Sequence, residues 1–254
     1  MARNSRFDGE TILITGVGRV GQVGEALAAS FAERGARLAL VDRTADDVEA
    51  RAAALRAQGH DARAFPCDLT DPASTAAMAG AVREAFGPAL DALVCAAGGF
   101  AATGALDAET DGAKAFDGFQ RQLAINLTTA YLATRAALPL LRARGGRVVY
   151  FASAAVLPDG DPAGLAAYAA AKAGVLALMR AVAADEHPRE GRNGVRIHGV
   201  RANAVAPTSV RTAANVASMG DQNTYVTRDA VADVVAWLAS AASAPVTGQM
   251  LRLG

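Results

Sequence analysis

The feature that most constrains this chain is a regular alternation of short apolar runs with longer segments of helical periodicity. The runs contain few polar residues, as do strands that are buried on both faces of a parallel sheet. The segments between them repeat apolar residues at i, i+3 and i+4, as at Val23, Ala26, Leu27 and Phe31. The candidate strands are Thr11–Thr15, Arg37–Val41, Ala62–Pro66, Ala92–Cys95, Arg147–Ala152, Val200–Val205 and Met250–Leu253.

This alternation predicts an α/β protein with a doubly wound Rossmann fold, in which helices flank a central parallel sheet of about seven strands. No linker, low-complexity tract or internal repeat divides the chain, so residues 1–254 are expected to form a single domain. Leu157–Gly164 and His187–Gly194 are expected to be loops because both contain proline and several glycines. Right-handed crossovers place the loops that follow the strands along one edge of the sheet, where ligands bind.

Composition and charge narrow the class of protein. Hydrophobic residues make up 52% of the chain and charged residues 20%, which allows a sizeable core. The formal net charge is +0 and no basic stripe occurs, so neither nucleic acid nor an anionic membrane is expected as a partner. The first residues lack the apolar core of a signal peptide, and no uninterrupted apolar run is long enough to span a bilayer. We therefore expect a soluble, cytoplasmic protein.

Cysteine and histidine give no support for metal chemistry. Cys67 and Cys95 each end an apolar run and are expected in the core. A disulfide framework or a zinc site would need more ligands at closer spacing. The three histidines are scattered along the chain and match no metal or triad pattern, so no metal is expected.

A glycine-rich turn directly follows the first candidate strand. Gly16, Gly18 and Gly21 fit the pattern GxGxxG between a strand and a helix. Glycines let the backbone approach a pyrophosphate, and the helix N-terminus offers free N–H groups and the positive end of its dipole. The turn predicts a dinucleotide site, although tight backbone packing alone would also explain the glycines.

The end of the second strand bears on the choice of dinucleotide. The carboxylate of Asp42 can accept hydrogen bonds from an adenosine ribose, and its charge disfavours a 2′-phosphate. NAD(H) is therefore the favoured cofactor, while Arg19 and Arg43 leave NADP(H) open.

A tyrosine, a lysine and a serine form the candidate catalytic group. Tyr168 and Lys172 are one helical turn apart, so the ammonium lies on the same helix face as the phenol and can lower its pKa. A phenol titrates near pH 10 and needs such a neighbour to act as an acid or base at neutral pH. Ser153 ends an apolar strand and can hydrogen-bond the reacting oxygen. The spacing YxxxK is weak by itself, because it also fits a surface tyrosine and lysine on an alanine-rich helix.

Taken together, the motifs resemble the short-chain dehydrogenase/reductase family over essentially the whole chain. The matching pieces occur in the family's order: the glycine turn, Asp42, Cys67-Asp68-Leu69, Ala96-Ala97-Gly98, Asn126, Ser153, Tyr168 with Lys172, and Asn203-Ala204-Val205-Ala206-Pro207. The resemblance implies an NAD(P)-dependent oxidoreductase that interconverts a secondary alcohol and a ketone with a tyrosine acid/base. It also implies a homo-oligomer, either a tetramer or a dimer, built through the two long helices that carry Asn126 and Tyr168.

The resemblance implies roles for individual residues. Tyr168 would be the acid/base, Lys172 would lower its pKa and hold the nicotinamide ribose, and Ser153 would stabilise the developing oxyanion. Asn126 would fix a water that links Lys172 to solvent, and Thr212 would hold the carboxamide. The implied cofactor contacts are Gly16, Gly18, Arg19, Gly21, Val23, Gly24, Asp42, Arg43, Asp68, Leu69, Ala96, Ala97, Gly98, Tyr168, Lys172, Pro207, Val210 and Thr212.

Three of these residues also have structural explanations. Asn126 could be a satisfied polar residue within a helix, and Ser153 a strand-end hydroxyl bound to the backbone. Asp68 could contact the adenine ring or belong to the turn that starts the next helix, although Asp71 is the better N-cap because Pro72 follows it.

The chain departs from the family's pattern at three places. The glycine turn is two residues longer than the usual TGxxxGxG, so Gly24 is its last glycine and Gln22 stands where the middle glycine is usual, a role that is open to Gly21. Ser153 lies two residues farther from Tyr168 than usual, which a longer loop between them explains. Two short motifs also differ, reading Ala96-Ala97-Gly98 and Pro207-Thr208.

Substrate choice is expected to come from three loops, Gly99–Thr110, Ala154–Ala167 and Ala213–Val226. The third loop, where the family carries a substrate-covering lid, is short, which favours an open pocket for a bulky or carrier-bound substrate. The expected substrate is a small-molecule or carrier-bound alcohol or carbonyl compound. Two other functions remain open: a regulatory protein that senses NAD(P), and a non-redox dehalogenase or isomerase of the same fold. The acid/base groups disfavour the sensor, and Lys172 disfavours the non-redox enzyme.

Overall fold

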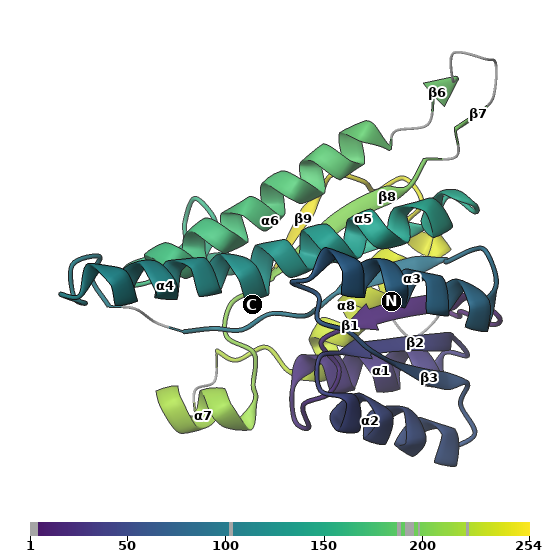
Figure 1. Ribbon diagram of the computed structural model, residues 1–254, viewed down its shortest axis with the longest axis horizontal. Helices are drawn as coiled ribbons and strands as arrows, with labels where there is room; N and C mark the ends of the chain where they lie inside the picture. The colour runs from purple at the N-terminus through teal and green to yellow at the C-terminus, as the bar shows by residue number, and fades with distance from the viewer. Residues whose placement is uncertain (1–4, 102–103, 187–188, 191–195, 198, 222–223) are drawn as a thin grey trace.

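The computed structural model describes residues 5–101, 104–186, 189–190, 196–197, 199–221 and 224–254, and it confirms the predicted doubly wound α/β fold (Figure 1). Seven parallel strands form one sheet in the order β3-β2-β1-β4-β5-β8-β9. Every predicted strand is present, with bounds that differ from the prediction by at most two residues. The strands are β1 (Thr11–Thr15), β2 (Arg37–Asp42), β3 (Ala62–Pro66), β4 (Ala92–Cys95), β5 (Arg147–Phe151), β8 (Arg201–Pro207) and β9 (Met250–Leu253).

The centre of the sheet is where its strands are most completely buried. All residues of β1 and β4 are buried, as expected for strands that are covered by helices on both faces. These two strands pair in parallel, with Thr15 opposite Cys95 at their carboxyl ends. The strand order reverses between them, and open α/β sheets bind ligands at such a switch point.

Helices cover the two faces of the sheet and enclose two apolar cores. One core contains α1 (Val23–Glu33), α2 (Ala45–Ala57) and α8 (Arg228–Ala239). The other contains α3 (Pro72–Phe86), α5 (Thr129–Arg142) and α6 (Ala166–Asp185). Helix α4 (Gly112–Leu123), the π-helical turn η2 (Ala124–Thr128) and α5 follow one another without a break and run beside α6 (Figure 1).

The remaining elements are short. They are the 3₁₀ turns η3 (Ala154–Val156) and η4 (Ala241–Ser243), helix α7 (Ala213–Met219), and the antiparallel pair of β6 (Arg189–Glu190) and β7 (Arg196–Ile197). Most of the predicted loop His187–Gly194 lies outside the described residues. The predicted loop Leu157–Gly164 connects η3 to α6, and Gly160 in it packs so closely that a Cβ would lie 2.2 Å from the carbonyl oxygen of Ala154.

Helix α6 is long and rich in apolar residues, although Lys172 and Arg180 interrupt its apolar sequence. Among the described residues, it is the one helix that is long and apolar enough to cross a bilayer by length and composition. It lies against β5 and β8, however, and its buried residues belong to an apolar core of the protein. Its apolar character is explained by this packing, which the helices of any large α/β core share.

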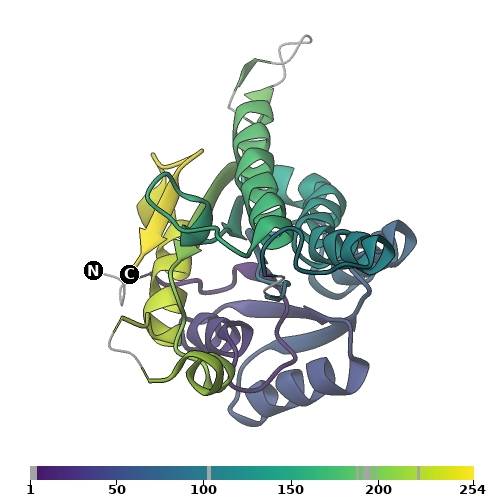
Figure 2. The same ribbon diagram turned by 90° about the vertical axis from the view of Figure 1, so that its left-hand side faces the viewer.

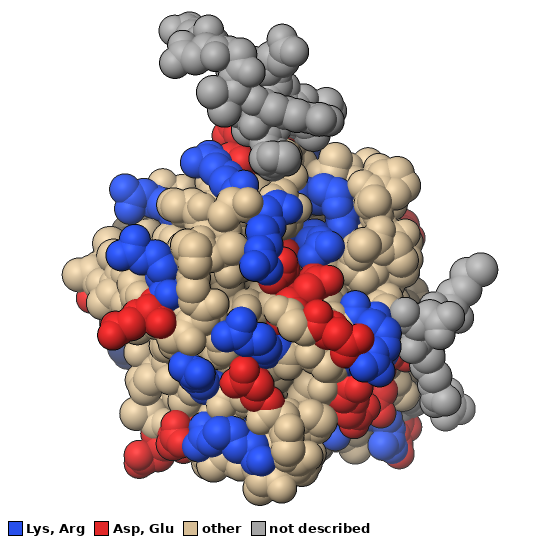
Figure 3. All heavy atoms as spheres, turned by 90° about the vertical axis from the view of Figure 1, so that its right-hand side faces the viewer, with Lys and Arg blue, Asp and Glu red and all other residues tan. Residues whose placement is uncertain are grey.

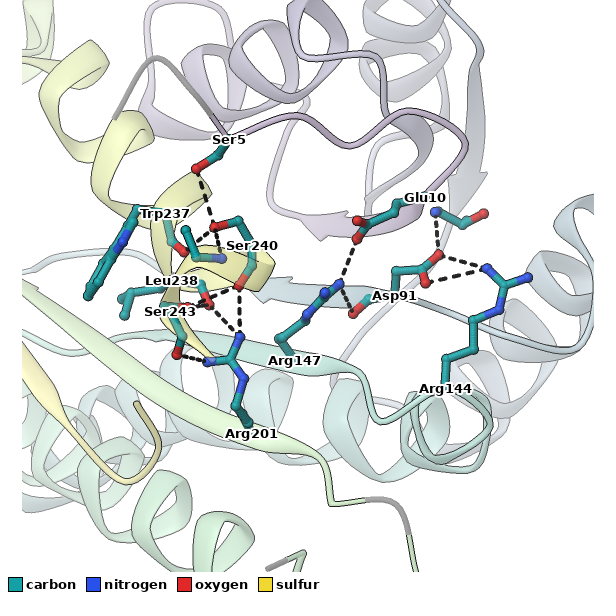
Figure 4. Close-up of polar contacts among 12 residues, drawn as sticks. Ser5, Glu10, Asp91, Arg144, Arg147, Arg201, Trp237, Leu238, Ser240 and Ser243 are labelled. Carbon is teal, nitrogen blue, oxygen red and sulfur yellow. Dashed lines mark hydrogen bonds and ion pairs between the residues drawn. The ribbon is translucent and has the colours of Figure 1, made fainter. Parts of the chain in front are cut away.

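The amino edge of the sheet carries paired charges of both signs (Figure 3). Arg147 pairs with Glu10 at 2.6 Å, and the carboxylate of Asp91 accepts hydrogen bonds from the Thr11 N–H and from Arg144. The guanidinium of Arg201 donates to the backbone carbonyls of Leu238, Ser240 and Ser243, at the ends of α8 and η4 (Figure 4). It also donates to the carbonyl of Val246, beyond η4. These contacts hold the C-terminal ends of helices against the sheet and give hydrogen-bond partners to the partly buried Arg201 cation.

Candidate active site

The predicted site residues lie at the carboxyl edge of the sheet. Figure 2 shows the molecule from this side. The glycine turn follows β1, Asp42 ends β2, Ser153 follows β5 and Pro207 ends β8. Helices add the other groups to this edge: Asn126 belongs to η2, and Tyr168 and Lys172 belong to the first turns of α6.

Close packing joins the start of the glycine turn to the end of β4. Gly16 has a φ of +78°, and a Cβ on it would lie 2.6 Å from the Cα of Ala97. The hydroxyl of Thr15 accepts a hydrogen bond from the Ala97 N–H at 3.0 Å and donates one to the Val94 carbonyl. A Cβ on Gly24 would lie 2.0 Å from the Gly16 oxygen, a contact typical of the glycine that packs helix against strand. Thr15 was not among the predicted site residues, although a polar residue at the end of a fully buried strand is a usable signal.

The carboxylate of Asp42 connects the glycine turn to β2. One oxygen accepts a hydrogen bond from the Gly18 N–H at 2.8 Å, and the other accepts one from the Arg43 N–H at 2.8 Å. A Cβ on Gly18 would lie 3.0 Å from the carboxylate carbon, so a side chain there would force the Asp42 carboxylate to shift. The structure thus fixes the carboxylate beside the glycine turn.

The start of helix α1 has the features of a pyrophosphate site. Its N-cap residue, Gln22, makes no capping hydrogen bond through its side chain, so no side chain of the cap competes for the first N–H groups of the helix. The positive dipole end of α1 points at the same region, and the glycines of the turn present backbone without side chains at their positions. Val23 is partly buried and Arg19 is exposed at the turn. The residues present therefore fit a dinucleotide.

Asp68 forms a turn with its own neighbours. Its carboxylate accepts hydrogen bonds from the Thr70 hydroxyl at 2.6 Å and from the Thr70 N–H at 2.9 Å, and these contacts hold its pKa below the ordinary value. Asp71 caps α3 through the N–H groups of Ala73 and Ser74, with Pro72 in the first helical position. Leu69 is buried between the two acids. Asp68 thus belongs to the turn before α3, with its exposed side chain near Arg43, and its contact with an adenine ring stays a prediction.

Burial changes the acid–base properties of the candidate catalytic pair. The ammonium of Lys172 donates to the Phe151 carbonyl at 2.9 Å, and burial lowers the pKa of Lys172 to about 8. It lies 5.7 Å from the centre of the Tyr168 ring. Burial also raises the pKa of Tyr168, although a hydrogen bond with the Ser153 hydroxyl works in the opposite direction. In the structure the Lys172 ammonium is directed to a backbone carbonyl, and the lowering of the Tyr168 pKa by Lys172 stays a prediction.

Asn126 is clamped to the loop that follows β4. Its side chain pairs with the backbone of Gly99, accepting from the N–H at 3.2 Å and donating to the carbonyl at 2.9 Å, and it also donates to Gln122. A Cβ on Gly98 would lie 2.7 Å from Asn126 Oδ1 and 3.6 Å from Lys172 Nζ, so all three groups meet at one point. π-Helical turns such as η2 are frequent at functional sites. Gly99 was predicted only as the start of a substrate loop and Gln122 was not predicted, since contacts of this kind leave no pattern in the sequence.

Packing between two helices brings this group together. A Cβ on Gly174 of α6 would lie 2.7 Å from the Leu127 side chain of η2, so the two helices approach closely at this glycine. Lys172 and Asn126 project from these same helices and are 7% and 1% exposed. The close approach thus places an amide and an amine side by side in the protein interior.

The residues that follow β8 form a capped turn near the same edge. Thr212 is buried, and its hydroxyl caps α7 by accepting from the Asn215 N–H at 3.1 Å. Val210, which precedes the third substrate loop, pairs with Val226 at the end of that loop.

An exposed aromatic ring contacts the proposed acid/base. Phe100 meets the Tyr168 ring edge-on at 5.1 Å while remaining 62% exposed. The phenyl ring thereby flanks the proposed acid/base.

One cavity in the described part of the molecule lies elsewhere. It has a volume of about 420 Å³ and is lined by residues that include Arg147, Glu186, Val200 and Arg201. These residues start β5 and β8 or end α6, so the cavity opens at the amino edge of the sheet, opposite the candidate catalytic group. Its size therefore does not identify the site.

Comparison with known proteins gives relatives of matching length and fold. D-threitol dehydrogenase of Mycolicibacterium smegmatis is 36% identical over 208 residues, which span 82% of this chain and 72% of that protein. A gluconate 5-dehydrogenase from Burkholderia cenocepacia J2315, solved with NADP and tartrate, is 28% identical with a TM-score of 0.84 and covers 98% of this chain and 94% of its own. NAD⁺-bound xylitol dehydrogenase is 27% identical with a TM-score of 0.81, covering 97% of this chain and 98% of its own. Residues 10–223 match the family described as short chain dehydrogenase, and the chain therefore belongs to the short-chain dehydrogenase/reductase family.

Proposed function

We propose that this protein is an NAD(P)-dependent oxidoreductase that interconverts a secondary alcohol and a ketone. The observation that carries the proposal is the convergence of Asn126 and Lys172 on Gly98, with Tyr168 and Ser153 in hydrogen-bonding contact beside them. This group adjoins a glycine turn that fits a dinucleotide. Acid/base and oxyanion-stabilising groups next to a cofactor site are what hydride transfer to a carbonyl requires.

Each residue of the group has a separate task in this proposal. A bound nicotinamide would supply or accept the hydride. Tyr168 Oη would exchange the proton of the substrate oxygen, and the Ser153 hydroxyl would hydrogen-bond that oxygen as charge develops on it. Lys172 would hold a proton close to the phenol, and Asn126 would keep the loop at Gly98 in place.

We favour NAD(H) as the cofactor. The Asp42 carboxylate faces the turn through the Gly18 N–H, so a 2′-phosphate would meet a fixed negative charge. The solved relatives named above carry NADP in one case and NAD⁺ in the other, so both cofactors occur on this fold at similar identity. Arg19 and Arg43 are the residues that would favour NADP(H).

The proposed substrate is a small-molecule or carrier-bound alcohol or carbonyl compound. The named relatives act, by their names, on D-threitol, gluconate and xylitol, which makes polyols and sugar acids the first compounds to test. Phe100 contributes an exposed aromatic face beside Tyr168, which suits the carbon skeleton of a substrate rather than its hydroxyl groups.

The proposal extends to the domain organisation, the localisation and the assembly of the protein. We expect residues 1–254 to form a single NAD(P)-binding domain that is soluble and cytoplasmic and that assembles as a homotetramer or homodimer. Exposed aromatic side chains on the α4–η2–α5 helix support the assembly, because solvent-exposed Phe116 and Tyr131 would gain from burial against another subunit.

Titration of the purified protein with NADH and NADPH, followed by nicotinamide fluorescence, tests this function first. Binding of NADH at least about tenfold tighter than NADPH is the expected result, corresponding to about 1.4 kcal/mol from Asp42. The preferred cofactor is then used with a panel of polyols, secondary alcohols and ketones. Binding of neither nicotinamide would overturn the oxidoreductase proposal, and tight binding with no turnover of any alcohol would favour an NAD(P) sensor.

A further inference from the structure

The lengthened glycine turn is tied to the rest of the protein by one carboxylate. Gly21 lies within the extra part of the turn and has a φ of +75°, a backbone conformation that suits glycine. Its N–H donates to Glu25 Oε2 at 2.7 Å. Glu25 belongs to the first turn of α1, so this bond closes the turn onto the helix that it leads into.

Two arginines from other helices hold the same carboxylate. Arg51 of α2 pairs with Glu25 Oε1 at 2.8 Å, and Arg228 of α8 pairs with Oε2 at 3.1 Å. Arg51 also donates through Nε to the Val17 carbonyl of the turn, at 3.4 Å. The network therefore joins helices α1, α2 and α8 to the glycine turn, at Val17 and at Gly21.

The carboxylate is charged in this setting. Burial favours the neutral acid, but the Gly21 N–H and the two guanidinium groups outweigh it, so the pKa of Glu25 lies below its ordinary value. The side chains of Glu25 and Arg51 are 25% and 14% exposed, which limits the screening of their attraction by solvent. Charge-assisted hydrogen bonds of this kind are stronger than neutral ones.

We propose that Glu25 is a positioning residue for the cofactor, which holds the lengthened turn in the shape that receives the pyrophosphate of the dinucleotide. This inference rests on the NAD(P) binding proposed above. Glu25 would act through its contact with the turn and would not touch the reacting atoms. A longer, glycine-rich turn has more backbone freedom to lose on binding. Glu25 removes part of that freedom in advance, and preorganisation of this kind increases affinity.

Glu25→Ala and Glu25→Gln test the role against Glu33→Gln, which changes an exposed glutamate at the other end of α1. We expect Glu25→Ala to weaken NADH binding roughly tenfold, as for one lost charge-assisted hydrogen bond, while kcat at saturating cofactor stays close to wild type. Glu25→Gln keeps an oxygen for the Gly21 N–H but loses the ion pairs, so its effect should be intermediate. Glu33→Gln should bind NADH as wild type does.

Two further measurements separate positioning from general loss of structure. Calorimetric titration with ADP and with adenosine should show weaker ADP binding in Glu25→Ala and unchanged adenosine binding, because the turn faces the diphosphate. Amide hydrogen exchange without cofactor should rise in residues 16–24 of Glu25→Ala and stay unchanged in Glu33→Gln. Equal losses for ADP and adenosine, or wild-type affinity of Glu25→Ala for NADH, would overturn the positioning role alone. A wild-type protein that binds neither nicotinamide would overturn both this role and the proposed function.

Discussion

At the scale of single residues, the candidate site buries two groups that prefer water when they are charged. Burial raises the pKa of Tyr168 and lowers that of Lys172, so it favours the neutral phenol and the neutral amine. The order of deprotonation is thereby reversed from that of free tyrosine and lysine. In this state Tyr168 is suited to donate a proton, whereas acting as a base requires an added stabilisation of the phenolate in the complex with cofactor and substrate.

Removal of the phenolic oxygen tests the acid/base role. Tyr168→Phe keeps the ring that Phe100 contacts but has no proton to exchange. We expect turnover to fall about 100-fold or more, the usual contribution of a general acid or base, with NADH affinity nearly unchanged. Steady-state kinetics and fluorescence titration measure the two quantities, with Tyr131→Phe on α5 as the matched control. Turnover near the wild-type rate in Tyr168→Phe would exclude the mechanism.

The buried amine of Lys172 predicts a dependence of stability on pH. The folded-state pKa of about 8 lies below the unfolded value of 10.5, so the unfolded chain binds more protons between these pH values. The free energy of unfolding should therefore rise with pH in this window, by about 3 kcal/mol in total at 1.36 kcal/mol per pKa unit.

Comparison with Lys172→Met isolates that contribution. Urea unfolding of both proteins at several pH values from 7 to 10 gives the difference in unfolding free energy, in which other titrating groups largely cancel. The difference should move in favour of the wild type as the pH rises. A difference that is constant with pH would show that Lys172 is not held in a strongly desolvated environment.

The spacing of residues in the sequence predicted the catalytic side chains that belong to motifs. It did not predict residues whose contacts involve main-chain atoms. Tyr168 and Lys172 could be paired because a helix places residues four apart on one face. Gly99 could not be linked to Asn126, since the contact uses main-chain atoms that every residue possesses. Glu25 was missed for a related reason, because its partners come from three separate elements and share no local pattern.

At the scale of secondary-structure elements, the glycines differ in whether the structure has room for a side chain at their positions. Gly80 lies on the exposed side of α3, and a Cβ there would have no atom within 4 Å. Gly98 follows β4, and its Cβ would displace Asn126 Oδ1. The same substitution should therefore have opposite effects at the two positions.

Gly80→Ala should stabilise the protein by about 0.5–1 kcal/mol, because alanine loses less backbone entropy in a helix. The melting temperature should rise by about 1–4 °C, and activity should be unchanged. Gly98→Ala should lower stability by about 1–3 kcal/mol through overpacking and reduce activity at the same time. Differential scanning calorimetry and kinetics on both variants check the pair, and equal behaviour of the two would contradict the close approach of Gly98 to Asn126.

The strands were easier to predict than the helical details. Continuous apolar runs such as β1 and β4 have one physical explanation in a chain of this composition, burial on both faces. The π-helical turn η2 has no such signature in the sequence, and its Asn126 contacts Gln122 and the loop at Gly99. Boundaries and bulges of this kind are fixed by tertiary contacts, which sequence periodicity does not contain.

At the scale of the whole molecule, exposed aromatic side chains lie along one long helix, which supports the proposed assembly. Phe116 and Phe119 of α4 and Tyr131 of α5 are 57%, 37% and 50% exposed. The same continuous helix carries Asn126, and it packs beside the helix that carries Tyr168 and Lys172. An interface on this helix would therefore also stabilise the positions of Asn126, Tyr168 and Lys172.

Light scattering of the purified protein should give the mass of a homodimer or homotetramer. Phe116→Ser combined with Tyr131→Ser should weaken the assembly by about 2 kcal/mol or more, as expected for central aromatic contacts, and shift it towards smaller species on dilution. Leu106→Ser is the matched control, since Leu106 is 85% exposed but lies outside this helix, in the loop before α4. Activity should fall together with mass in the double variant, because the helix that loses its partner also holds Asn126. A wild-type monomer, or an unchanged mass of the double variant at all concentrations, would contradict assembly through this helix.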